Sequence, residues 1–329
     1  MDILHHFPQA CRTTEHPAPA RLTGRQTVVM LHNPTLKIGR WVASACLVAS
    51  FGTSLVHAQQ APGAAELQAK HTAMASQLAR NQFQRPLVMD STETSQAVSG
   101  SVYAVINYPY GAVLTAFKNP ETWCEVMILH LNTKHCSADK DSQPATMSVS
   151  VGKKTPQELK DAHALTFSFT PAATRADYLA VRLNAPKGPL GTHNYRIDLE
   201  AVPLDGDRTF MHLRYSYGYG ITSRLAMQAY MATVASSKIG FSEVAGESGS
   251  AKAPVGGMRG AVERNTMRYY LAIDAYLASL AVPASQQFEK RLQHWFDATE
   301  RYPRQLHEID RAAYLSMKRS EYKRQQATP

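Results

Sequence analysis

Gly260–Ala281 is the stretch that most constrains how this chain can fold. It begins after a glycine-rich turn and ends before Pro283. Side chains that suit a buried face recur along it every three or four residues, at Val262, Thr266, Tyr270, Ile273, Leu277 and Leu280. This period places them on one side of a helix, so the stretch predicts a long amphipathic helix packed on another layer.

The first two turns of this helix carry a cluster of polar side chains: Glu263, Arg264, Asn265, Arg268 and Tyr269. Arg264 and Arg268 lie four residues apart and repel by roughly 0.2–0.5 kcal/mol unless an anion lies near them. One interpretation is a site for an anion or a polar headgroup, because a helix N-terminus favours negative charge. The other is that both arginines pair with carboxylates of the sheet or of the C-terminal helices, since buried arginines are usually paired.

Between residues 100 and 244 the hydrophobic period changes to two. Apolar and polar side chains alternate in successive runs around Val102, Val149, Phe167, Val181, Ile197 and Leu213. Such runs, separated by short turns, predict a meandering antiparallel sheet with one buried face. Tyr215, Tyr217 and Tyr219 share a face of one strand, where aromatic residues either fill a core or line a pocket. We also expect short helices in Gly111–Met127, an extended segment from Ile128, a helix at Ser223–Ser236 and a last strand at Lys238–Val244.

Helical patterns flank this region. Ala64–Gln82 predicts a surface helix and Gln84–Ser99 a connector. Ser285–Tyr302 predicts another helix, and the segment from Pro303 a last one, whose charged end Lys318–Gln325 is expected in solvent. We therefore expect an α+β domain over residues 100–281, preceded by a helix and connector (59–99) and followed by a helical appendage (282–329).

Residues 1–58 have the order of a secretory leader. Lys37 and Arg40 precede the apolar run Trp41–Val56, and Val56 and Ala58 are the small residues of a cleavage site before Gln59. The run is too short for a membrane span. We predict a signal peptide and a periplasmic product, with a buried helix as the alternative, and a start at either Met1 or Met30.

Removing the leader leaves 30 Lys and Arg against 24 Asp and Glu, a balance of +6. A moderately basic surface suits peripheral contact with an anionic lipid or polymer, although solubility alone accounts for it. Nucleic acid is not expected as a partner, because an exported protein rarely meets it.

Cys124 and Cys136 are the two cysteines that remain after the leader. In an oxidising compartment an isolated pair predicts a disulfide. Free thiols are one alternative, and a metal site with His130 and His135 is another. No further CxxC or HxxxH motif accompanies them, so neither a metal nor a cofactor is expected.

The order of these elements resembles the START/SRPBCC superfamily, the helix-grip fold also seen in pathogenesis-related plant allergens. The resemblance covers roughly residues 100–281 and rests on the opening VYAVINYPYGAVLTAFKNPETWCEV and on the helix from Gly260. It implies a curved antiparallel sheet gripping the long C-terminal helix, here with extra N- and C-terminal helices. The Ser223–Ser236 helix departs from the pattern and is expected to interrupt the strand order.

Members of that superfamily typically bind an apolar ligand between sheet and helix, and some are cyclases or hydrolases. No catalytic signature is present, so we expect an exported binder of a hydrophobic or amphipathic small molecule, such as a lipid, rather than an enzyme. The expected ligand-binding residues are Glu263, Arg264, Asn265, Arg268, Tyr269, Tyr270, Ile273, Tyr215 and Tyr217. Two alternatives stay open: a cyclase- or hydrolase-like enzyme, and a structural or partner-binding protein whose cavity is filled by its own side chains.

Overall fold

The N-terminal part of the described chain is helical, as expected. The computed structural model describes residues 62–233, 237–244 and 252–327. The predicted leader, its cleavage site and both start methionines lie outside these residues. The helices α1 (Pro62–Ala73) and α2 (Ala75–Ala79) come first and lead into the sheet.

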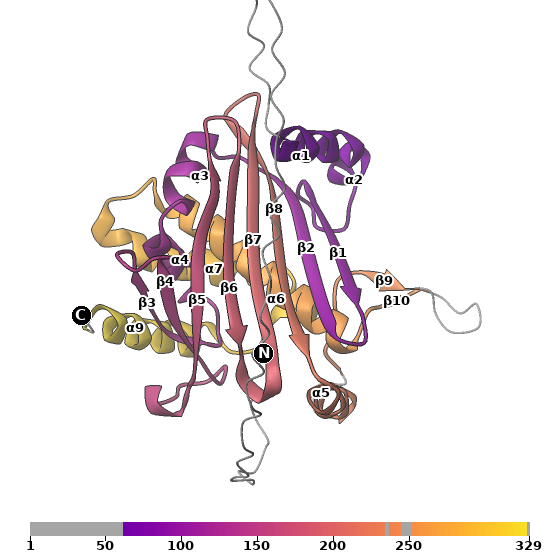
Figure 1. The fold of residues 1–329 in the computed structure, drawn as a ribbon, viewed down its shortest axis with the longest axis vertical. Helices are drawn as coiled ribbons and strands as arrows, with labels where there is room; N and C mark the ends of the chain where they lie inside the picture. Colours follow the sequence, from indigo (N-terminus) through magenta and orange to yellow (C-terminus); the bar gives the residue numbers. More distant parts are fainter. Residues whose placement is uncertain (1–61, 234–236, 245–251, 328–329) are drawn as a thin grey trace, which may run out of the picture. The chain divides into compact units, whose positions relative to one another are not determined.

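One eight-stranded antiparallel sheet forms the centre of the fold (Figure 1). Its strands lie side by side in the order β1-β2-β8-β7-β6-β5-β4-β3. The bounds are β1 (Leu87–Glu93), β2 (Ala97–Ile106), β3 (Thr133–Asp139), β4 (Thr146–Val151), β5 (His163–Thr174), β6 (Leu179–Lys187), β7 (Thr192–Leu204) and β8 (Arg208–Tyr219). Short 3-10 turns, η1 (Leu159–Asp161) and η2 (Pro189–Gly191), precede β5 and β7. Because β8 pairs with β2, the sheet closes back onto its first long strand.

Two short helices and one long helix complete the helix-grip arrangement. α3 (Tyr110–Phe117) and α4 (Pro120–Met127) follow β2, and α6 (Gly257–Ser279) follows the sheet. α6 crosses one face of the sheet and approaches β2 so closely that a Cβ on Gly100 would lie 2.5 Å from Thr266 Oγ1. The predicted α+β helix-grip fold is confirmed by this order of two strands, helix pair, six strands and, after α5, the long helix.

Side chains of the strands alternate between two apolar cores. On β8, Leu213 and Tyr215 face α6 in the main core, which we call the inner side of the sheet. Phe210, one residue out of phase with them, packs with Leu67 of α1 and Leu78 of α2 on the outer side. α1 and α2 thus cover one end of the outer face (Figure 1).

Three helices follow α6: α7 (Ala284–Thr299), α8 (Pro303–Leu306) and α9 (Arg311–Ala327). The segment from Pro303 is therefore two helices, not the expected single one. Trp295 of α7 and Tyr314 of α9 belong to the same core as α6. No described helix is long and apolar enough to cross a membrane.

The charged end of α9 is not in solvent as expected. α9 lies against β3, the last strand of the sheet order, and Lys318 and Glu321 are buried. Gln325 Oε1 accepts a hydrogen bond from the Cys136 N–H at 3.0 Å, and Arg324 donates to the Lys134 carbonyl at 3.3 Å. Side chains of α9 thus take the place of a neighbouring strand at this edge.

Four other expectations are corrected. Gln84–Ser99 is not a connector, since it contains β1 and the start of β2. The extended segment expected from Ile128 begins only at Thr133. Of Lys238–Val244 only β9 (Glu243–Val244) is a strand, and it pairs with β10 (Ala253–Pro254) outside the main sheet. The helix α5 (Ile221–Thr233) follows the last strand of the main sheet, so it does not interrupt the strand order.

Candidate functional site

Aromatic rings from the sheet and from α6 meet on the inner face. The rings of Tyr195 and Tyr217 stack with centroids 5.2 Å apart, and the Tyr215 centroid lies 5.9 Å from that of Tyr217. From α6, the Tyr269 ring reaches to 5.4 Å from Tyr215 and 5.0 Å from His130. We call Tyr195, Tyr215, Tyr217, Tyr219 and Tyr269 the tyrosine cluster.

The strand period produces this arrangement, because alternate residues of β8 point to the same side. The hydroxyls of Tyr195 and Thr192 are hydrogen-bonded at 2.9 Å, and the Tyr219 hydroxyl donates to the Thr94 carbonyl at 2.9 Å. Burial raises the pKa of both tyrosines to about 12, so both phenols are neutral at physiological pH.

Tyr269 differs from its neighbours in the cluster. Burial raises the pKa of its phenol, with a further increase from Tyr195, yet the side chain keeps some accessible surface. Its hydroxyl makes no hydrogen bond to another residue of the described chain. The hydroxyl therefore has its hydrogen-bonding capacity free for a water or another molecule that reaches this accessible surface.

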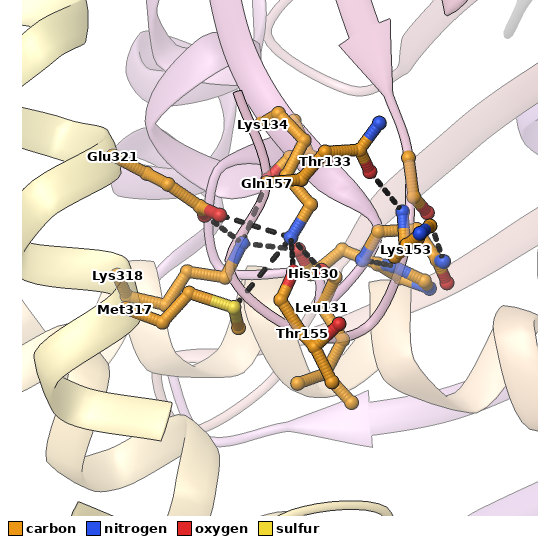
Figure 2. A network of polar contacts seen from close by, with 12 residues as sticks. His130, Leu131, Thr133, Lys134, Lys153, Thr155, Gln157, Met317, Lys318 and Glu321 are labelled. Atoms are coloured by element: carbon orange, nitrogen blue, oxygen red, sulfur yellow. Dashed lines mark hydrogen bonds and ion pairs between the residues drawn. The ribbon is translucent and has the colours of Figure 1, made fainter. Parts of the chain in front are cut away.

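The turn that carries His130 is fixed by α9 (Figure 2). Lys318 Nζ donates to the carbonyl oxygens of His130 and Thr133 at 2.6 and 2.7 Å. Lys318 shares the carboxylate of Glu321 with Lys134, at 2.8 and 2.9 Å. Burial is the largest influence on Lys318 and lowers its pKa to about 8. The network therefore fixes the backbone of His130, whose ring stacks on Tyr269.

The helix α5 lies at one end of the tyrosine cluster. Met227 of α5 belongs to the main core. The charge of Arg224 lowers the pKa of the Tyr219 phenol, against the larger increase from burial. Ile221 and Leu225 are large apolar side chains with 81% and 62% of their surface exposed. α5 thus joins the cluster on one side and presents apolar groups to solvent on the other.

The polar cluster of α6 is buried and has protein partners. Glu263 accepts hydrogen bonds from the Ser91 hydroxyl at 2.5 Å and from the N–H groups of Phe241 and Ser242 at 2.6 and 2.9 Å. Asn265 accepts a hydrogen bond from Arg268 of the same helix at 3.3 Å. Glu263 thus joins α6 to β1 and to the segment after α5.

Both arginines of the cluster are fully buried. Arg264 donates to the Ile239 carbonyl at 3.1 Å, and Arg268 pairs with Glu308 at 2.8 Å. Glu308 lies between α8 and α9, so Arg268 has the carboxylate partner in the C-terminal helices that the second interpretation required. A ligand-binding role for Glu263, Arg264, Asn265 and Arg268 stays a prediction.

Tyr270 and Ile273 lie in the main core. The guanidinium of Arg85 lies over the Tyr270 ring, 4.9 Å from its centroid, and burial raises the pKa of this phenol. The Tyr270 hydroxyl is buried and finds no partner within the described residues. Tyr269, next to Tyr270 in the chain, contacts Tyr215 of β8. The expected stripe through Thr266, Tyr270 and Ile273 is itself buried.

Cys124 of α4 and Cys136 of β3 form the predicted disulfide. This bond excludes the two alternatives considered above, free thiols and a metal site through Cys136. It joins the helix pair to the edge strand on which α9 lies.

Tyr195 was not among the candidates taken from the sequence, and Tyr219 was recognised on the same face as Tyr215 and Tyr217 but was not named as a ligand-binding residue. Tyr195 and Tyr219 occupy the same inward positions of their strands as Ile197 and Tyr217. The period-two series contained both, so the signal was present in the sequence. The sequence did not show that β7 pairs with β8, which is what brings Tyr195 beside the tyrosines of β8.

The sequence matches no family model and no curated protein. Solved structures of START/SRPBCC type nevertheless resemble the fold. Norcoclaurine synthase of Thalictrum flavum, in complex with dopamine and hydroxybenzaldehyde, is 10% identical, with 45% of this chain and 80% of that chain covered and a TM-score of 0.31. Human StAR-related lipid transfer protein 5 is 10% identical, with 47% and 82% covered and a TM-score of 0.26. A protein from Arthrobacter aurescens is 14% identical, with 59% and 92% covered and a TM-score of 0.32. At these values the likeness concerns the fold alone. The assignment of the fold class rests on the strand order described above.

Proposed function

We propose that this protein binds a hydrophobic or amphipathic small molecule between the inner face of its sheet and α6. The observation that carries the proposal is Tyr269, a phenol among core aromatic rings that keeps some accessible surface and whose hydroxyl has no hydrogen-bond partner in the described chain. Small-molecule sites combine apolar and aromatic walls with a few polar groups that orient the ligand. The tyrosine cluster supplies both kinds of group.

The ligand that fits this chemistry is largely apolar and carries one hydrogen-bonding group. A neutral phenol donates to or accepts from a hydroxyl, carbonyl or carboxyl group, and the surrounding rings cover an apolar chain or ring system. A lipid of this kind is the class that we propose first. The exposed Ile221 and Leu225 of α5, together with the basic balance of the chain, suit peripheral contact with an anionic membrane that supplies it.

Export to the periplasm is part of the same proposal. It is supported by the leader pattern of residues 1–58 and by the Cys124–Cys136 disulfide, since such bonds persist in oxidising compartments. Detection of the protein in a periplasmic extract, with its N-terminus at Gln59, is the expected result. A cytoplasmic protein that retains residues 1–58 would exclude it.

Native mass spectrometry tests the binding proposal. Protein purified from its native compartment is expected to carry a stoichiometric apolar molecule, which organic extraction then identifies. Tyr269→Ala is expected to lose at least 90% of this bound mass. Tyr276→Ala is the matched control, because Tyr276 is a half-buried tyrosine two turns further along α6 that packs on Phe117 and Arg291 instead.

Two outcomes contradict the proposal. One is a folded protein that carries no ligand and takes up no fluorescent fatty-acid analogue. The other is equal loss of ligand in Tyr269→Ala and Tyr276→Ala. Either would favour a protein whose inner space is filled by its own side chains.

A further inference from the structure

A polar pocket of about 590 Å³ lies on the outer face of the sheet, away from the tyrosine cluster. Its position follows from the strand register. On adjacent strands, Ser216 of β8 lies opposite Ser99 of β2, and Gly218 lies opposite Ala97. These small residues form a low floor, because their neighbours on either side are longer. α1 and α2 cover the other end of this face, beside Tyr103 and Phe210.

The walls of the pocket come from an irregularity in β7 and from the β1–β2 hairpin. The pairing of β7 with β8 shifts register between His193 and Arg196, and Asn194 has a left-handed backbone with a φ of 51°. The irregularity brings His193 over Gly218, where a Cβ would lie 2.8 Å from the ring. A side chain at Gly218 would therefore displace this wall.

Two guanidinium groups line this pocket. Arg196 of β7 lies opposite Ser216, and Arg214 of β8 lies two residues before Ser216, so the arginines are diagonal neighbours on adjacent strands. Both side chains are exposed, and neither forms an ion pair with a described residue. The nearest carboxylate in the register, Asp198, is bonded to Arg182 at 2.7 Å.

No carboxylate is found among the described residues that line the pocket. Its other polar lining groups are the neutral hydroxyls and amides of serine, threonine, asparagine and glutamine, with His193. Guanidinium groups prefer oxyanions, which they bind through paired N–H groups. Hydroxyls and amides pair equally well with the hydroxyls of a sugar.

We propose that this outer pocket binds a small anionic carbohydrate, with its carboxylate or phosphate held by Arg196 and Arg214 and its hydroxyls by the serine floor. The volume is within the range of small-molecule sites. The proposal is independent of the inner apolar site, because the two lie on opposite faces of the sheet. A free sugar and a sugar unit at the end of an envelope polymer share this chemistry.

Isothermal titration calorimetry of the mature protein tests the proposal with glucose 6-phosphate and glucuronate as probes. Saturable binding of at least one is expected, weakened at least tenfold by Arg196→Gln and by Arg214→Gln. Arg208→Gln is the control, because Arg208 lies at the opposite end of β8, outside the pocket, and donates a hydrogen bond to the Asp205 carbonyl. It is expected to leave binding unchanged. All three arginines are exposed, so thermal unfolding should confirm that each variant is folded.

Glucose and inorganic phosphate separate the two parts of the proposed recognition. Each is expected to bind at least tenfold more weakly than glucose 6-phosphate. Equal binding of phosphate would overturn the carbohydrate assignment, and equal binding of glucose would overturn the role of the arginines. If glucose 6-phosphate or glucuronate competes with an acidic oligosaccharide, both kinds of ligand use the same site. If no acidic probe binds saturably, the proposal is overturned.

Discussion

The buried lysines of the α9 network show how a single residue can set the pH response of the protein. Lys134 and Lys318 share one carboxylate, that of Glu321 (Figure 2). The side chains of both lysines are fully buried. One positive charge is therefore in excess within a dehydrated site, and burial lowers the pKa of both amines. The sequence pattern suggested a solvated helix end, because it contains no information on the β3 edge that α9 covers.

We predict that the protein becomes more stable as the pH rises above about 8. Lys318 has a folded-state pKa of about 8, against about 10.4 for an unfolded lysine. Between these values the unfolded chain binds more protons, so the free energy of unfolding rises by up to about 1.4 kcal/mol per pH unit. Urea unfolding between pH 7 and 9.5 measures this slope, and the window ends before unfolded tyrosines ionise.

Lys318→Met removes the titrating group and is expected to reduce this slope. Lys323→Met, an exposed lysine on the same helix, is expected to leave the slope unchanged. If wild type and Lys318→Met change in parallel with pH, the lowered pKa of Lys318 is wrong.

At the scale of elements, α9 protects an open sheet edge and α6 depends on a close approach to β2. Edge strands expose unpaired N–H and C=O groups, and proteins commonly cover them with other segments. Here Gln325 supplies the acceptor for the Cys136 N–H, while Lys318 and Arg324 supply donors for carbonyls of the same strand.

We predict that Gln325→Ala destabilises the protein by about 1–3 kcal/mol, because the buried Cys136 N–H loses its acceptor. Gln326→Ala changes the adjacent, exposed glutamine and is expected to stay within about 0.5 kcal/mol of wild type. Denaturant unfolding gives both values, and amide hydrogen exchange at Cys136 localises the effect. Equal stability of the two variants would exclude a role for α9 in capping this edge.

The contact of α6 with β2 gives a second prediction at this scale. A Cβ on Gly100 would lie 2.5 Å from Thr266 Oγ1, so Gly100→Ala is expected to destabilise by about 1–3 kcal/mol. In a Thr266→Ala background the hydroxyl is absent, and the same substitution should cost less. A double-mutant cycle from unfolding free energies measures this coupling, and additive effects would contradict the close approach.

Across the whole molecule, local periodicity predicted most helices and strands. It could not predict which polar side chains pair with residues far away in the sequence. The period of two predicted most strands of the sheet, and the period near 3.6 predicted α6 and α7. β1 was missed because an inward position of this strand is Ser91, a polar residue that bonds Glu263 of α6. The tyrosines of β8 were recognised, but the periodic pattern did not show that Tyr269, which lies outside the apolar stripe, contacts Tyr215.

The charged groups of α6 show the same limit. Their spacing indicated that an anion lies near Arg268, and the structure supplies Glu308, forty residues later. No sequence pattern links these positions. The fold was therefore predictable from periodicity, whereas the partners of the buried charges required the packing of helices that follow α6.

Glu308 joins cations from three separate segments of the described chain, so its carboxylate links the C-terminal helices to α6 and to two loops. Its carboxylate lies 2.8 Å from Arg268 of α6 and 2.7 Å from Lys154 in the loop after β4. It also lies 3.2 Å from Lys238 in the segment after α5. We predict that Glu308→Gln destabilises by about 3–5 kcal/mol, because it leaves the buried Arg268 guanidinium without its carboxylate. Urea unfolding at pH 7 measures the change.

The controls for this prediction separate loss of the charge from loss of the side chain. Glu300→Gln alters a more exposed carboxylate whose partner is His307, and it is expected to change stability by less than about 1 kcal/mol. Arg268→Met in the Glu308→Gln background removes the unpaired charge, so the double variant should regain part of the lost stability. If Glu308→Gln unfolds at the same urea concentration as Glu300→Gln, the ion pairs of Glu308 do not hold the C-terminal helices on α6. If the double variant is instead less stable than Glu308→Gln, the remaining contacts of Arg268, with Asn265 and the Leu306 carbonyl, provide its stabilisation in place of the carboxylate.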